Sequence, residues 1–339
     1  MILHPWILVL VIGHSTLLLV FSLGLVNSWQ IYRGWDYNST EEKQFLLEKK
    51  TYLVSSVMNF VLFMQILMLF LFAMAVDELA DVLPGAMCAV GTLSSSPYGF
   101  ALLNLKIITL FLYFIWLVIN CLDNQIETYP LVRKKYLGLM LLYPLVAAET
   151  VLLFAFSSDL DPSVITSCCG SIYNAGTEGW GASLAEASAT SILPLFFTIA
   201  IVLLLNRFIS ECLNEGRKRL SNLLQFPLWI AFFITAVIVI ISFISTYVYE
   251  MLSHNCPFCF IGAEYHYYGV ALYCSLFVAT ATGMTGGVLE MIKQPQTLVE
   301  KARLFQNKMQ RVSLWSMLAF VMLGFLPFIT YYVKTGRFI

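Results

Sequence analysis

The sequence predicts an all-α integral membrane protein, a polytopic bundle of about eight transmembrane helices. Of its 339 residues, 59% are hydrophobic and only 12% are charged, against roughly 25% charged in an ordinary soluble domain. Long apolar runs alternate with short polar connectors, which indicates that membrane lipid solvates most of the chain. This composition excludes a water-soluble enzyme and disfavours nucleic acid as a partner.

The expected helices follow from the thickness of the membrane. A bilayer core of about 30 Å needs about 20 mostly apolar residues in a helix. Eight segments meet this length: 6–29, 51–76, 101–121, 136–157, 190–208, 225–249, 267–289 and 313–333. The first is expected to be a retained helix, because residues 1–6 carry no Lys or Arg and no cleavage site precedes Gln30. The connectors hold no soluble domain, so residues 1–339 are expected to form a single transmembrane domain.

Lys and Arg alternate strictly between the connectors. The first, third, fifth and seventh connectors carry sixteen of them, whereas the second, fourth and sixth carry none. By the positive-inside rule the basic connectors face the cytoplasm and both termini lie outside. Only Lys334 and Arg337 lie on the opposite side. We therefore expect a plasma (inner) membrane protein whose second, fourth and sixth connectors form the outer face.

Five of the eight cysteines fall in the three connectors without basic residues: Cys88, Cys168, Cys169, Cys256 and Cys259. In a plasma-membrane protein these connectors face an oxidising compartment, where thiols tend to be paired, metal-bound or catalytic. Cys121, Cys212 and Cys274 are explained as small apolar residues of membrane helices. An odd number of outer cysteines leaves at least one unpaired or shared, unless it pairs with Cys274 or with a partner protein.

The sharpest motif is Cys256-Pro257-Phe258-Cys259, at the junction between the sixth and seventh expected helices. Pro257 can open a helix, which would make Cys256 the N-cap and place Cys259 one turn on. The positive end of the helix dipole would then lower both thiol pKa values and favour the attacking thiolates. The motif also suits a structural disulfide or a zinc half-site. Nearby His254 and His266 favour both the redox and the metal interpretation.

The other two outer connectors carry the remaining thiols. Cys168 and Cys169 are adjacent in sequence and would form a strained ring if oxidised together. We expect one or both to pair elsewhere, to exchange disulfides or to hold a soft metal. Cys88 precedes a segment of small residues, 91–99, that suits a closely packed loop. Thiols from three loops could therefore converge on one site.

Ionisable residues also lie in the predicted outer halves of the helices, namely His14, Lys106 and Glu149. Such groups are costly in a membrane and normally face the bundle interior. A Lys106–Glu149 pair joined by His14 is expected; it either locks helices together or forms a pocket for a quinone headgroup or a proton relay. All four histidines lie in the predicted outer half, which excludes haems stacked across the membrane but leaves one outer haem open.

The cysteine layout resembles the DsbB and vitamin K epoxide reductase class of membrane thiol oxidoreductases. The resemblance implies a CxxC at the outer end of a helix beside a bound quinone, with loop cysteines that relay electrons. Cys256 and Cys259 match the CxxC, and Cys88, Cys168 or Cys169 would stand for the shuttle cysteines. The match covers about a tenth of the chain. The chain departs from the class in its eight helices and its vicinal cysteine pair.

Three functions follow from these observations. The first is a redox protein that passes electrons between the outer cysteines and a membrane quinone near His14, Lys106 and Glu149, or an external redox partner drawn to the acidic outer face. The second is a protein that binds or transports a soft metal, or holds an iron cluster or haem, with ligands from Cys88, Cys168, Cys169, Cys256, Cys259, His254 and His266. The third is a non-catalytic subunit of a respiratory complex, bound to other membrane subunits and stapled by its cysteines.

Overall fold

The computed structural model describes residues 1, 3–37, 42–126, 129–163, 189–212, 215–251, 254–292 and 296–337. Helices dominate these residues, which contain no strand. Within them, eight helices are long and apolar enough to cross a membrane. The predicted all-α fold with eight helices that could span a membrane is thereby confirmed, and these helices are consistent with contact with membrane lipid. The side of the membrane on which the termini lie stays a prediction.

The chain divides into two compact units. Unit 1 contains Met1–Pro84, Thr92–Thr166 and Pro295–Lys301. Unit 2 contains Gly85–Gly91, Ser167–Gln294 and Ala302–Ile339. A short stretch around Cys88 therefore belongs to unit 2, although the chain on both sides of it belongs to unit 1. The single transmembrane domain stays a prediction.

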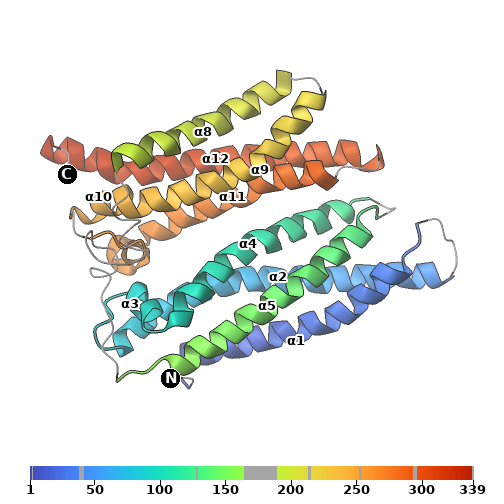
Figure 1. Ribbon diagram of the computed structural model, residues 1–339, viewed down its shortest axis with the longest axis horizontal. Helices are drawn as coiled ribbons and strands as arrows, with labels where there is room; N and C mark the ends of the chain where they lie inside the picture. Colours follow the sequence, from blue (N-terminus) through green and yellow to red (C-terminus); the bar gives the residue numbers. More distant parts are fainter. Residues whose placement is uncertain are drawn as a thin grey trace. The chain divides into compact units, whose positions relative to one another are not determined.

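Unit 1 is a four-helix bundle made of α1 (Pro5–Gly34), α2 (Glu42–Glu78), α4 (Pro97–Asp123) and α5 (Val132–Asp159). Helices α1 and α4 each pack against both α2 and α5 (Figure 1). Proline occupies the first turn of α1 and of α4, where its missing N–H costs no hydrogen bond.

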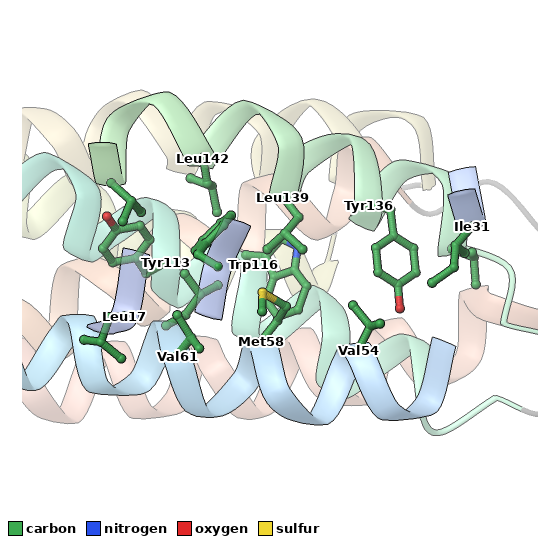
Figure 2. Close-up of a cluster of buried hydrophobic side chains, with 14 of the residues drawn as sticks. Leu17, Ile31, Val54, Met58, Val61, Tyr113, Trp116, Tyr136, Leu139 and Leu142 are labelled. Atoms are coloured by element: carbon green, nitrogen blue, oxygen red, sulfur yellow. The ribbon is translucent and has the colours of Figure 1, made fainter. Parts of the chain in front are cut away.

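Apolar side chains from all four helices fill the interior of unit 1. Figure 2 shows Leu17 of α1, Met58 of α2, Trp116 of α4 and Leu139 of α5 within this core. The polar tip of the tryptophan is satisfied, because Trp116 Nε1 donates to the Lys135 carbonyl over 2.8 Å. The large ring is therefore buried without leaving an unpaired donor.

Unit 2 contains three further long helices and most of a fourth: α8 (Ala189–Cys212), α9 (Glu215–Val239), α11 (Tyr268–Ile292) and α12 (Gln296–Thr335). The first residues of α12, as far as Lys301, belong to unit 1. A π-helical turn, Ile240–Ile244, joins α9 to the short α10 (Ser245–Tyr249). Helix α9 packs against α8 and α11 (Figure 1).

A small-residue face of α11 lets α9 approach closely. A Cβ atom added to Gly283 would lie 2.1 Å from the Trp229 ring, and one added to Gly287 would lie 2.8 Å from Phe226 Cβ. Both positions therefore need glycine for this packing, as small residues at four-residue spacing indicate in membrane helices.

Three helices begin well before the apolar segments from which they were predicted. Helix α2 begins at Glu42 rather than at residue 51, α9 at Glu215 rather than at residue 225, and α12 at Gln296 rather than at residue 313. The length rule recognises only the part of a helix that lipid can solvate. Glu, Lys, Arg and Gln are good helix formers, so they extend these three helices beyond that part.

Candidate cysteine site

Unit 2 brings three of the predicted site cysteines together. The Sγ atoms of Cys88, Cys256 and Cys259 all lie within 4.8 Å of one another, and those of Cys88 and Cys256 are 3.7 Å apart. Cys256 is 1% exposed and Cys88 4% exposed, whereas Cys259 is half-buried. Two of the three expected loops therefore converge. Cys168 and Cys169 lie outside the described residues.

The Cys-Pro-Phe-Cys segment does not begin a helix. Helix α11 begins at Tyr268, and Cys259–Ile261 form a single 3₁₀ turn in the loop before it. The prediction that Cys256 caps the seventh helix was therefore wrong. A long-helix dipole consequently does not act on the two thiols, and the loop must be held by other contacts.

Tyrosine side chains hold this loop. Tyr249 Oη donates to the Cys256 carbonyl over 2.7 Å and accepts from the Phe260 backbone N–H over 3.1 Å. Tyr273 Oη donates to the Pro257 carbonyl over 2.8 Å. These bonds satisfy buried backbone groups that a helix would otherwise have paired. The local preference of Pro257 for a helix start is thus outweighed by contacts from α10 and α11.

The π-helical turn Ile240–Ile244 lies directly before α10, the short helix that ends at Tyr249. Ser245 Oγ donates to the Ile240 carbonyl over 2.7 Å, which satisfies an oxygen within the widened turn. Helix α10 then ends at Tyr249, because Glu250 adopts a left-handed conformation with φ of 56°. Inserted π turns of this kind are frequent at functional sites.

Aromatic rings line the cysteine loop. The ring of Tyr249 lies 4.3 Å from that of His254 and 5.1 Å from that of Tyr265, measured between centroids. Burial raises the pKa of the Tyr265 phenol, and the nearby Cys259 and Glu264 raise it further. His254 and the exposed His266 are not among the described side chains grouped within 4.8 Å of the sulfurs.

The expected ionic pair is present in unit 1. Lys106 Nζ lies 3.2 Å from Glu149 Oε2 and 2.7 Å from His14 Nε2. All three side chains are buried. Because the Lys106 ammonium can only donate, His14 Nε2 accepts and the imidazole proton is assigned to Nδ1. Within the described part of the chain, His14 Nδ1 has no hydrogen-bond partner.

Two further residues of α4 complete this cluster. Tyr113 Oη donates to Glu149 Oε1 over 2.8 Å, and Thr109 Oγ1 donates to the same oxygen. Thr109 and Tyr113 follow Lys106 by three and seven residues, the spacing of one helix face. That spacing could have identified them from the sequence. The cluster ties α1, α4 and α5 together, and its role in binding a quinone stays a prediction.

A second buried ion pair was missed by the sequence analysis. Lys135 Nζ lies 2.7 Å from Asp123 Oδ2, with both side chains fully buried. Asp123 Oδ1 also accepts from the Leu131 backbone N–H over 2.8 Å. Lys135 had been assigned to a basic connector that orients the protein. In the fold it joins the end of α4 to the start of α5.

Unit 2 contains a buried cluster of amides and one carboxylate, also missed from the sequence. Asn222 Nδ2 donates to Glu290 Oε2 over 3.0 Å, and Gln310 Nε2 donates to Gln225 Oε1 over 2.9 Å. The cluster joins α9, α11 and α12. Each of these side chains bonds to a side chain of another helix. The pattern of residues along one helix therefore does not predict the cluster.

No known protein family, curated protein or solved structure matches this chain.

Proposed function

We propose that this protein is a membrane thiol–disulfide oxidoreductase in which Cys88, Cys256 and Cys259 exchange disulfides. The observation that supports the proposal is the mutual separation of their sulfurs, at most 4.8 Å. Disulfide exchange requires a thiolate to attack a sulfur of a neighbouring disulfide. A third sulfur beside a pair is therefore the arrangement that a relay needs.

The proposed reaction transfers two electrons. Two thiols of the site lose two electrons and two protons and form one disulfide, while a membrane quinone gains both and becomes a quinol. The quinone carbonyl would accept hydrogen bonds from His14 and Lys106, with Glu149 beside them, and Cys168 or Cys169 would act as shuttle cysteines. An external redox protein, on the outer face of the plasma membrane, is the alternative electron partner.

The test is the thiol state of the full chain in detergent. Thiols are alkylated before and after reduction, each cysteine is mapped by mass spectrometry, and bound metal is assayed on the same sample. We expect a soluble quinone to convert a reduced pair among the three site cysteines into a disulfide. Cys121→Ser, at an exposed position of α4, serves as a control and should leave that oxidation unchanged. Site thiols that stay reduced in the presence of quinone and of an external disulfide would contradict the proposal.

A soft-metal site is the second candidate, and the shortest sulfur separation favours it. Two thiolates bound at about 2.3 Å to one tetrahedral ion lie about 3.8 Å apart, close to the 3.7 Å between Cys88 and Cys256. Thiolates suit copper(I), zinc or an iron cluster. Stoichiometric metal in the isolated protein, with site thiols that alkylate only after chelation, would establish this function instead.

A further inference from the structure

The three sulfurs differ in what can reach them. Cys88 and Cys256 are nearly inaccessible, at 4% and 1% exposure, whereas Cys259 is half-buried. An external sulfur must come into contact with the sulfur that it attacks. Only one member of the group is therefore open to a partner in the folded protein.

Cys256 is the most deeply buried of the three cysteines. Its sulfur is 3.7 Å from that of Cys88, and it shares the short loop with Cys259. Its own backbone is held by Tyr249, whose Oη donates to the Cys256 carbonyl over 2.7 Å. Because that carbonyl is held inside the fold, we expect Cys256 to exchange with sulfurs of the site rather than with an external partner.

We propose that Cys259 is the cysteine that exchanges with an external thiol or disulfide, and that Cys256 passes the oxidation on to Cys88. This order rests on the proposed thiol–disulfide function and assigns a separate role to each sulfur. The partner is a molecule or protein that presents an accessible disulfide or dithiol.

Each step balances. The Cys259 thiolate attacks an external disulfide, forms a mixed disulfide and releases one external thiolate. The Cys256 thiolate then attacks the Cys259 sulfur, which forms the Cys256–Cys259 disulfide and releases the second external thiolate. The Cys88 thiolate finally attacks Cys256, which forms the Cys88–Cys256 disulfide and returns Cys259 to a thiolate. The external disulfide gains two electrons and the site loses two; the reverse sequence oxidises an external dithiol.

The experiment uses the reduced full chain in detergent, with the five cysteines outside the site, Cys121, Cys168, Cys169, Cys212 and Cys274, replaced by alanine. The probe is the aromatic disulfide 5,5′-dithiobis(2-nitrobenzoate), whose released thiolate is coloured, and adducts are mapped by mass spectrometry. We expect Cys256→Ser to keep a stable adduct on Cys259. Cys88→Ser should still form the Cys256–Cys259 disulfide. Cys259→Ser should slow modification of Cys256 and Cys88 by about tenfold or more, because both are buried.

The results separate the two proposals. If the parent chain forms no disulfide among the three cysteines, the thiol–disulfide function itself fails. Three results overturn only the order: a Cys88–Cys259 disulfide in Cys256→Ser, an adduct on Cys88 in that variant, or a Cys259→Ser variant that reacts at the parent rate. Thermal unfolding checks that each variant folds. If Cys259→Ser unfolds, the parent chain is treated briefly with substoichiometric probe and the first adduct is mapped. A first adduct on Cys259 supports the order, and one on Cys88 or Cys256 overturns it.

Discussion

A single phenol oxygen, that of Tyr249, makes hydrogen bonds at both ends of the Cys-Pro-Phe-Cys loop. Tyr249→Phe would keep the ring contacts with His254 and Tyr265 and remove both bonds. The Phe260 N–H would lose its partner and the Cys256 carbonyl would keep only a 3.4 Å bond from Ser245 Oγ, which should cost about 1–3 kcal/mol of unfolding free energy. Because the loop is then less confined, we also expect faster alkylation of Cys256. Thermal unfolding and mass-spectrometric alkylation rates measure the two effects.

Tyr267→Phe is the matched control for this change. Tyr267 is 61% exposed, so loss of its hydroxyl should alter neither unfolding nor the alkylation rate. An unchanged Cys256 rate in Tyr249→Phe would show that the tyrosine does not confine the loop.

The Lys106–Glu149 pair makes a different prediction, because both charges are buried. Lys106→Met alone leaves an uncompensated carboxylate and should cost about 3–5 kcal/mol. The double variant Lys106→Met, Glu149→Gln removes that charge, so we expect it to be more stable than the single one. Thermal unfolding in one detergent compares them. The single variant Glu149→Gln completes the comparison. If the double variant loses as much unfolding free energy as the two single variants together, the two groups are not coupled.

The two buried ion pairs also show what the sequence can reveal about single residues. Lys106 and Glu149 were predictable, since each is a lone charge within a long apolar segment. Lys135 was not, because it stands beside Arg133 and Lys134 in a basic run. The turn between α4 and α5 brings Lys135 Nζ to 2.7 Å from Asp123 Oδ2. Because burying a charge is costly, a lone charge in an apolar segment can be predicted to have a buried partner. For a charge within a basic run, the sequence does not tell whether the side chain is buried or exposed.

At the scale of helices, the close approach of α9 and α11 depends on Gly283. Gly283→Ala would place a Cβ 2.1 Å from the Trp229 ring, so the ring must move. Overpacking of this kind costs about 1–3 kcal/mol, which should lower the unfolding temperature. Gly216→Ala in α9 is the control, because a Cβ there meets no atom within 4 Å. Its better helix propensity should leave stability equal or raise it by up to about 1 kcal/mol. Equal effects of the two variants would contradict the packing argument.

The helices themselves were largely predictable, and the loop that carries the site was not. Lipid imposes a length and a composition on each membrane-crossing helix, and both can be read from consecutive residues. The conformation of residues 256–259 depends instead on hydroxyls of Tyr249 and Tyr273. Those partners belong to separate helices, so local preference at Pro257 gave the wrong helix start.

For the whole molecule, the alternation of basic connectors makes a prediction about topology. Residues 125 and 162 lie beyond opposite ends of α5, and both are exposed. In intact cells, a membrane-impermeant maleimide should label Pro162→Cys above the wild-type background. Gln125→Cys should be labelled only after the membrane is permeabilised. The reverse pattern would invert the predicted orientation and place the site cysteines in the cytoplasm.

The separation of 168 positions between Cys88 and Cys256 imposes a delay on biosynthesis. At about 5–20 residues per second, a ribosome needs roughly 10–30 s to add the second cysteine after the first. Four other cysteines, Cys121, Cys168, Cys169 and Cys212, are translated within this interval, so other thiols are available to Cys88 before Cys256 exists. Under the proposed thiol–disulfide function, correct pairing is therefore expected to depend on translation speed relative to the local rate of thiol oxidation. Slower translation in an oxidising compartment should increase the share of mispaired chains.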